Sequence, residues 1–298
     1  MQLKKDVEKK TIHVEFDSLE DLSNCLRADD GRTGSHGRSY INSNFCKFSY
    51  QEAQTFLENG WMEGVSKMDA IIREIEGSGD GEQSFIKYDV FGDFFNVGRF
   101  MSGEPECCGR FLKRKTKNQE INIMVNVSAP AYLDQGIMIN RGAAIQALVD
   151  KLLDTHYVNL QFVEYVCGIG GYDMTITVNC DTRNFYSREA VAFMTGNPAF
   201  LRRICFVVNE IALKSDNLNG SGYGRPRDIL EKDRKNIDLY FPSFSYGDEE
   251  NKWRSVESSR KSIQKIIDEY QEKDQEADSP YMPPAPERKP AIAGVYGA

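Results

Sequence analysis

The sequence predicts a mixed α/β fold, in which helices flank a central mixed β-sheet and N-terminal helices and β-hairpins are added to it. Residues 121–127, 157–166, 173–180 and 239–241 have the apolar or alternating composition of strands. Segments with helical apolar spacing follow the first and the third of them, which gives the order βαββαβ. At 298 residues with 40% hydrophobic residues, the chain is long enough and apolar enough to bury a large core.

Two topologies share the order βαββαβ. One is a doubly wound sheet with one antiparallel hairpin strand, as in a degenerate von Willebrand A-like domain, and the other is the ferredoxin-like split βαβ. Strand 121–127 is apolar at nearly every position, as expected of a central strand covered on both faces, and this favours the first topology. The alternative stays open.

Along the chain, residues 1–11 read as a flexible charged leader, followed by one domain over 12–247 with an N-terminal part (12–120) and a core (121–247). Residues 12–16 alternate as a half-buried strand does. Ser18 and Ser49 are placed to cap helices, the second ending at Asn59–Gly60, and a further helix is expected over 66–76. Residues 29–40 are rich in Gly, Ser and Arg and predict a loop, and 85–127 look strand-rich.

The C-terminal part predicts an amphipathic helix over 248–271 and a disordered acidic and Pro-rich tail over 272–298. The apolar positions of the helix recur every three or four residues from Trp253 to Tyr270, which places them on one stripe. Such a stripe packs on its own domain or supports a homo-oligomer through residues 253–270.

Several classes of function are disfavoured by composition. No apolar run approaches the roughly 18 to 20 residues that span a bilayer, and the charged N-terminus has no apolar region of a secretory signal. Seven scattered cysteines and three histidines offer neither a disulfide framework nor zinc-ligand spacing. We therefore expect a cytoplasmic protein with no metal and no cofactor. The net charge of −8 opposes nucleic-acid binding globally, but a binding footprint is local.

The segment from Phe94 to Lys117 has the composition of a single-strand binding surface. Five cations fall within residues 110–117 without an acid among them, and phenylalanines interleave with the arginines before them. Cations neutralise phosphates and exposed rings stack on unpaired bases, each stack contributing roughly 1 to 3 kcal/mol. The alternative is a hairpin with its aromatic residues in a core and its lysines in a solvated turn.

Two further arginine pairs are candidates for phosphate contacts. Arg225 and Arg227 follow the glycine-rich stretch 217–224, which reads either as a flexible loop or as a backbone that approaches phosphate. Arg202 and Arg203 lie in a strongly apolar helix, where a structural role competes with a functional one.

The stretch from Asn126 to Pro130 ends the first core strand, where an A-type domain carries Asp-x-Ser-x-Ser for Mg²⁺. An asparagine replaces the carboxylate and a proline replaces the last serine, so a hard cation lacks its anionic ligand. We find no nucleophile and base with catalytic spacing, and expect no enzyme. A metal-dependent enzyme on this degenerate scaffold is the third hypothesis.

Three blocks are similar to those of a family of phage and actinobacterial proteins: YDVFGDFFNVGRFMSGEPECC (88–108), RGAAIQALVDKL (141–152) and NPAFLRR (197–203). Over roughly residues 12–245 the layout resembles the Drc-like single-stranded-DNA-binding RNA polymerase cofactors of virulent podoviruses. The resemblance implies a protein of the host cytoplasm that binds single-stranded DNA with little sequence preference and assists a phage RNA polymerase in transcription. It carries over no individual DNA contacts.

The first hypothesis is therefore a single-stranded DNA-binding RNA polymerase cofactor. The alternative is a protein-interaction scaffold that uses the C-terminal helix and tail without touching nucleic acid. On chemistry alone, the candidate DNA-binding residues are Arg99, Arg110, Phe111, Lys113, Arg114, Lys115, Lys117, Arg202, Arg203, Arg225 and Arg227.

Overall fold

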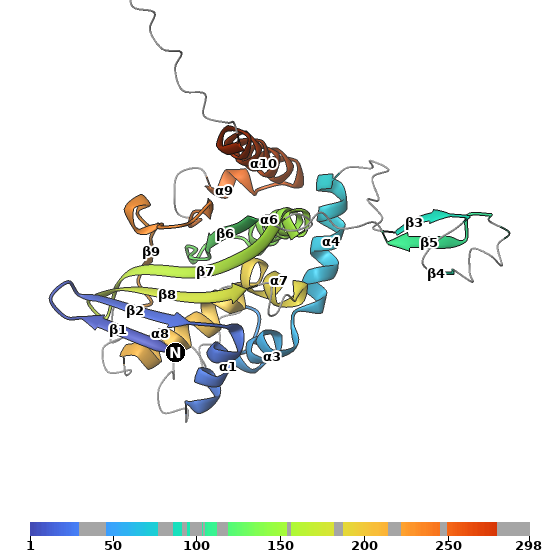
Figure 1. Ribbon diagram of the computed structural model, residues 1–298. Helices are drawn as coiled ribbons and strands as arrows, with labels where there is room; N and C mark the ends of the chain where they lie inside the picture. The colour runs from blue at the N-terminus through green and yellow to red at the C-terminus, as the bar shows by residue number, and fades with distance from the viewer. Residues whose placement is uncertain are drawn as a thin grey trace, which may run out of the picture. The chain divides into compact units, whose positions relative to one another are not determined.

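A computed structural model describes residues 1–29, 46–76, 86–90, 94–95, 103, 105–111, 119–153, 156–181, 187–213, 222–244 and 249–278. The chain divides into two compact units, Met1–Ile263 and Gln264–Ala298. The fold is mixed α/β, as predicted (Figure 1).

The core of the first unit is a seven-stranded mixed sheet in the order β1-β2-β8-β7-β6-β10, with β9 paired to β7. Its strands are β1 (Gln2–Asp6), β2 (Thr11–Phe16), β6 (Gln119–Asn126), β7 (His156–Ile169), β8 (Tyr172–Asp181), β9 (Arg225–Pro226) and β10 (Leu239–Phe241). Helix α6 (Gln135–Leu153) joins β6 to β7. The predicted order βαββαβ is confirmed over β6 to β10.

Strand order and direction decide between the two topologies. Strand β6 lies between β7 and β10 and runs parallel to both, whereas β8 runs antiparallel to β7. The order β8-β7-β6-β10 is the third, second, first and fourth strand of the motif, which is the order of a doubly wound sheet. A ferredoxin-like sheet would not pair its first two strands in parallel, so that alternative is excluded.

The predicted leader is a strand for half of its length, and this corrects the sequence analysis. Residues Gln2 to Asp6 form β1, which pairs antiparallel with β2 in the register Lys4 opposite His13. The strand is highly charged and lies at the edge of the sheet, where charged residues protect against association with other chains. Its composition therefore resembled a solvated leader.

Within the described ranges 19–29 and 46–76, the helices that follow β2 are α1 (Leu19–Ala28) and α3 (Tyr50–Asn59), as the capping residues predicted, and α4 (Met62–Glu76). The Ser18 hydroxyl accepts a hydrogen bond from the amide of Asp21, and Ser49 forms a reciprocal capping box with Glu52. Gly60 ends α3 with a φ of 82°. Helix α4 begins four residues before the predicted start.

The helical segment predicted after the third core strand is broken. It consists of α7 (Arg188–Gly196), a π-helical turn η1 (Phe200–Cys205) and α8 (Phe206–Leu213). The break falls at Asn197–Pro198, because proline has no amide hydrogen and clashes with the preceding turn. The Asn197 side chain accepts from the amide of Ala199 instead.

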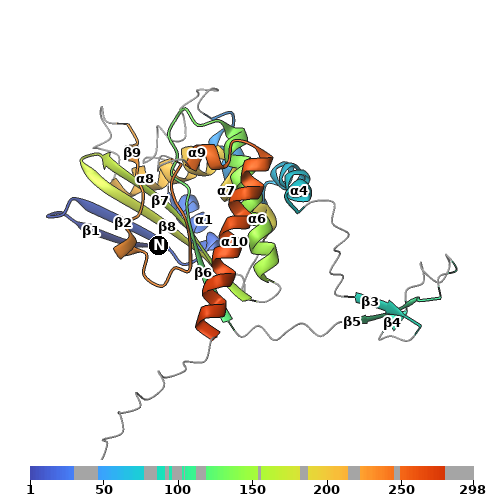
Figure 2. The same ribbon diagram turned by 90° about the horizontal axis from the view of Figure 1, so that it is seen from above.

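The two faces of the large sheet differ. One face carries the apolar alternation of every long strand and is buried; helices α1, α3 and α8 lie below it in Figure 1. Its buried members are Ile12, Val14, Phe16, Ile121, Ile123, Val125, Val158, Leu160, Phe162, Met174, Ile176 and Val178. On the opposite face, which Figure 2 looks onto, none of the described long helices covers β1 and β2, and Lys4 and His13 are exposed, whereas Val163 of β7 is buried. We call this the open face.

A separate three-stranded sheet has the order β3-β5-β4 and consists of β3 (Ile86–Asp89), β4 (Phe94–Phe95) and β5 (Cys108–Phe111). It falls within the segment predicted to be strand-rich.

The C-terminal helix begins later and ends later than predicted. A short helix α9 (Glu249–Lys252) precedes α10 (Val256–Asp278), so the first seven residues of the predicted disordered tail are helical. Residues 279–298 lie outside the described residues. Trp253 lies between the two helices, 6.3 Å from the Phe241 ring by centroids, and is buried with Ile263. The apolar stripe therefore packs at least partly on its own chain.

None of the described helices is by itself long and apolar enough to cross a membrane, although the bent pair α7 and η1–α8, at 74°, meets the length and composition criteria together.

Candidate functional site

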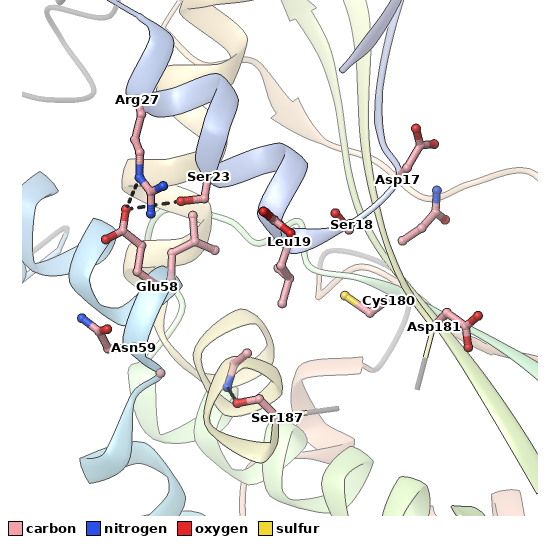
Figure 3. Close-up of a pocket in the computed structure, with 15 residues that line it drawn as sticks. Asp17, Ser18, Leu19, Ser23, Arg27, Glu58, Asn59, Cys180, Asp181 and Ser187 are labelled. Carbon is pink, nitrogen blue, oxygen red and sulfur yellow. Dashed lines mark hydrogen bonds and ion pairs between the residues drawn. The ribbon is translucent and has the colours of Figure 1, made fainter. Parts of the chain in front are cut away.

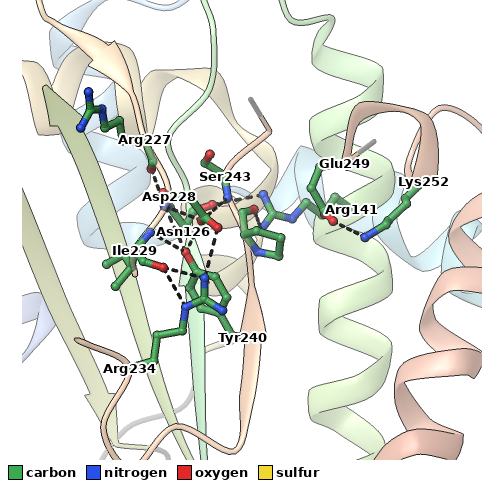
Figure 4. A network of polar contacts seen from close by, with 11 residues as sticks. Asn126, Arg141, Arg227, Asp228, Ile229, Arg234, Tyr240, Ser243, Glu249 and Lys252 are labelled. Atoms are coloured by element: carbon green, nitrogen blue, oxygen red, sulfur yellow. Dashed lines mark hydrogen bonds and ion pairs between the residues drawn. The ribbon is translucent and has the colours of Figure 1, made fainter. Parts of the chain in front are cut away.

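The carboxyl ends of β6 and β10 form the topological switch point of the sheet, where doubly wound proteins commonly bind ligands. In this chain, polar side chains from β6, α6 and the segment before β10 fill that position (Figure 4). We call Asn126, Ser128, Arg141, Asp228 and Tyr240 the switch-point cluster. Their hydrogen bonds determine whether this position has free polar groups for a ligand.

The polar groups of Asn126 and Ser128 are engaged in bonds within the protein. The Asn126 amide oxygen accepts from the amide of Ser128 at 3.0 Å, and its nitrogen donates to the carbonyl of Arg227 at 2.9 Å. The Ser128 hydroxyl bridges the amide and the carbonyl of Tyr165 at 2.7 and 3.0 Å. Both side chains are fully buried.

Asp228 belongs to the same cluster and comes from the segment between β9 and β10. Its carboxylate accepts from the Tyr240 hydroxyl, from the amide of Ser243 at 3.1 Å, and from the Arg234 guanidinium at 3.2 Å. Burial, together with the hydrogen bond to Asp228, raises the pKa of Tyr240 to about 12. The guanidinium of Arg234 lies over the Tyr240 ring, 3.7 Å from its centroid. This carboxylate is therefore used to hold the segment before β10.

Arg141 lies on α6 beneath the switch point and is fully buried. It donates to the carbonyls of Asn126 at 3.1 Å and Pro242 at 2.8 Å, so it joins the ends of β6 and β10. Its guanidinium lies 4.4 Å from the centroid of the Phe244 ring. Burial lowers the pKa of Arg141 to about 10, with Glu249 opposing the change.

The switch point is thus closed by its own hydrogen bonds rather than arranged around a ligand. No group of three His, Cys, Asp or Glu side chains in the described ranges has the arrangement to hold a metal ion.

Arg202 and Arg203, predicted as phosphate contacts, are structural, and this corrects the sequence analysis. They are 4% and 3% exposed in η1. Arg202 donates to the carbonyls of Pro130 and Ala131 at 3.2 and 3.0 Å, and Arg203 donates to the carbonyl of Phe48 at 2.8 Å. A buried guanidinium needs such partners, so both fix the loops packed against η1.

A pocket of about 640 Å³ lies between α1, the end of α3, the end of β8 and the start of α7 (Figure 3). Among the described residues that line it, the acidic side chains outnumber the cations. The acids are Asp17, Glu20, Glu58 and Asp181, and the cation is Arg27. Arg27 is already paired with Glu58 at 2.9 Å. This balance repels phosphate, and none of the predicted DNA-binding residues that the structure describes lines the pocket.

The thiol of Cys180 also lines this pocket. Burial raises its pKa to about 12. The thiol therefore stays protonated near neutral pH, and a protonated thiol is a poor nucleophile.

The small sheet contains two of the predicted residues, Arg110 and Phe111, both in β5. Its register places Lys87 opposite Arg110 and Ile86 opposite Phe111. Arg99, Lys113, Arg114, Lys115 and Lys117 lie outside the described residues.

Arg225 and Arg227 are exposed and lie at β9, beside the open face of the large sheet. The amide of Arg227 donates to the carbonyl of Tyr165, which extends the pairing of β9 with β7 by one residue. Tyr165 is opposite Thr175, Thr175 is opposite His13, and His13 is opposite Lys4. We call Lys4, His13, Thr175, Tyr165 and Arg227 the transverse row. The first four lie side by side across β1, β2, β8 and β7, and Arg227 directly follows β9.

Sequence reasoning missed the row for identifiable reasons. The alternation of Ile12, Val14 and Phe16 already implies that His13 faces the other way, but the partner strand β1 was taken for a leader. Pairing between segments as distant as β2 and β8 has no local sequence signal. Arg141 was missed because an arginine in an apolar helix is indistinguishable from one that reaches solvent.

The fold and the closed switch point define a mixed α/β protein in which the chain's own polar side chains fill the carboxyl ends of β6 and β10. The chain belongs to the family of the domain of unknown function DUF7192, whose model matches residues 4–269. No curated protein and no solved structure matches it.

Proposed function

We propose that the protein binds single-stranded DNA, with the three-stranded sheet β3-β5-β4 as its first contact surface. The observation that carries the proposal is the register of β3 and β5, which sets Lys87 directly opposite Arg110. Like charges directly opposite each other destabilise a pair of strands. An anionic ligand such as a phosphate relieves that repulsion.

The other face of this small sheet carries aromatic residues around a glycine, because consecutive residues of a strand point to opposite faces. Tyr88 from β3 and Phe94 from β4 are both opposite Gly109, on either side of β5. Residues opposite each other in neighbouring strands share a face, and glycine adds no side chain between them. Two aromatic residues flanking a glycine suit the stacking of unpaired bases, which every base permits. The cations of 113–117 directly follow β5 in sequence.

The role in transcription rests on the resemblance to phage RNA polymerase cofactors. In this proposal the protein holds single-stranded DNA for a phage RNA polymerase in the host cytoplasm and catalyses no reaction itself. The scaffold alternative is less favoured, because Trp253 and Ile263 of the C-terminal stripe are buried against their own chain. Stimulation of a phage RNA polymerase on a promoter with an exposed single strand tests this part separately.

The binding itself is tested by fluorescence anisotropy of a labelled single-stranded oligonucleotide at several salt concentrations. For the wild type, log K should fall by roughly 0.7 per log unit of salt for each phosphate contacted. Lys87→Ala/Arg110→Ala should weaken binding and reduce that slope by roughly 1.4. The matched control is Lys151→Ala/Lys261→Ala, which removes two exposed helical cations. Binding of the wild type that is absent, or that does not change with salt, contradicts the proposal.

A further inference from the structure

The transverse row is a continuous line of five residues on one face of the large sheet. Opposite residues in neighbouring strands share a face, so the register from β1 through β2, β8 and β7 places Lys4, His13, Thr175 and Tyr165 together. Arg227 extends the line through its amide bond to Tyr165 at 2.9 Å. With strands about 4.8 Å apart, the row is roughly 19 Å long.

The two ends of the row are exposed and its middle is partly covered. Lys4, His13 and Arg227 are exposed, and Thr175 and Tyr165 are half-buried between neighbouring strands. Figure 2 looks onto this face, and none of the described long helices covers the β1 and β2 end of the row.

The chemistry of the row is cationic at both ends and aromatic between them. The backbone amide of Arg227 donates to the Tyr165 carbonyl, so the cation and the ring belong to residues that lie next to each other across the sheet. Burial raises the pKa of Tyr165, Asp173 adds to the rise, and Arg227 opposes it. Cations that track a backbone beside rings that stack on bases are the elements of single-strand recognition.

Acidic residues border the row on both sides. On one side of the row, Asp6 and Asp173 lie on the same face, two residues along their strands from Lys4 and Thr175. On the other side, Glu15 lies two residues along β2 from His13. Asp6 is paired with Lys9 at 3.6 Å, Asp173 accepts from the amide of Gly168, and Glu15 accepts from Asn179. A duplex wide enough to cover these rows would bring its phosphates against carboxylates, whereas one strand that follows the row avoids them.

We propose that the transverse row is a second contact surface for the same single-stranded nucleic acid, crossing the strands of the large sheet from Lys4 to Arg227. The inference rests on the proposed function and adds to it a surface outside the small sheet. It commits the row to a single strand rather than to a duplex or a second copy of the chain.

The test compares variants of the row with matched controls. Lys4→Ala/Arg227→Ala removes the two end charges, and Tyr165→Val removes the ring while keeping a residue suited to a strand. The controls are Lys151→Ala/Lys261→Ala for charge and Tyr132→Val for an exposed loop ring. Lys4→Ala alone, in an edge strand, is the conservative version should the double variant be unstable by circular dichroism.

Binding is measured with labelled oligothymidine of about 30 nucleotides, several times the footprint of one small binding surface. The charge variant should reduce the salt slope by roughly 1.4, and Tyr165→Val should weaken binding about fivefold or more. Neither control should change the slope or the affinity. An unlabelled duplex should compete poorly with the wild type.

The outcomes separate the two proposals. If the wild type binds, and Lys87→Ala/Arg110→Ala weakens binding while the row variants behave like their controls, the row is not a contact surface and the proposed function stands. If the row variants weaken binding and the small-sheet variant does not, the row is the main surface and the small sheet is not the first contact. A wild type that binds no single strand overturns both. Equal binding of duplex and single strand overturns the commitment of the row to a single strand.

Discussion

The two faces of the large sheet treat charged residues in opposite ways. On the covered face, Glu164 of β7 is 1% exposed and its carboxyl accepts from the Asn209 amide of α8 at 3.0 Å. On the open face, Lys4 and His13 are exposed, and the residues between them and Arg227 are only half-buried. Charged side chains are therefore buried in the fold on one face and accessible to a ligand on the other.

The four candidate arginines outside the small-sheet segment show the same difference. Arg202 and Arg203 donate to backbone carbonyls inside the fold, whereas Arg225 and Arg227 lie exposed at β9. In sequence both pairs are candidates for phosphate contacts, one in an apolar helix and one after a glycine-rich stretch. The packing of η1 against the loops at Pro130 and Phe48 buries the first pair. Three pairs of substitutions test whether buried and exposed side chains differ in their effects on stability and on DNA binding.

The largest effect is expected at Glu164, through the pH dependence of stability. Burial raises its pKa from 4.5 to about 8, and the bond from Asn209 opposes the rise. Between these values the folded state keeps a proton that the unfolded state releases, so stability falls as pH rises through this window. At about 1.36 kcal/mol per pKa unit, the loss approaches roughly 5 kcal/mol above pH 8.

Urea unfolding at pH 5, 7 and 9 measures this dependence. Glu164→Gln, which cannot ionise, should remove most of the loss between pH 5 and 9. The matched control is Glu15→Gln on the open face of β2, which should leave the pH dependence as in the wild type. A wild type as stable at pH 9 as at pH 5 would show that Glu164 ionises without penalty and that the two faces do not differ in this respect.

Much of the fold follows from sequence because its signals are local. Ser18 and Ser49 cap helices through bonds to residues three positions on, and the alternation of β2 and β8 marks their buried face. The errors arose where the decisive partner is distant. The charged strand β1 is a strand only because β2 pairs with it, and the role of Arg202 depends on a loop some 70 residues earlier. The same limit hid the transverse row, whose members come from four strands and from the residue that follows β9.

The second effect is expected at Arg141, which joins the ends of β6 and β10. Arg141→Ala leaves the carbonyls of Asn126 and Pro242 without their donor and opens a cavity beside Phe244. Each unsatisfied buried group costs roughly 1 to 3 kcal/mol, so we expect a loss of about 3 to 5 kcal/mol in the free energy of unfolding. The measurement is the urea midpoint at pH 7, with Arg234→Ala, on the half-buried side of the same cluster, expected to lose less. Equal losses would mean that Arg141 does not hold the switch point closed.

The smallest effect provides the sharpest comparison, between Arg202 and Arg225. Arg202→Met keeps much of the side-chain volume but removes the donor to the carbonyls of Pro130 and Ala131, for an expected loss of about 2 kcal/mol. Arg225→Met changes an exposed side chain and should alter stability by less than about 0.5 kcal/mol. For DNA affinity we expect the reverse order, because Arg225 neighbours the transverse row and Arg202 is sealed inside. Thermal unfolding and oligonucleotide anisotropy on both variants give the two orders, and if Arg202→Met weakened DNA binding without destabilising the fold, the assignment of η1 to a structural role would be wrong.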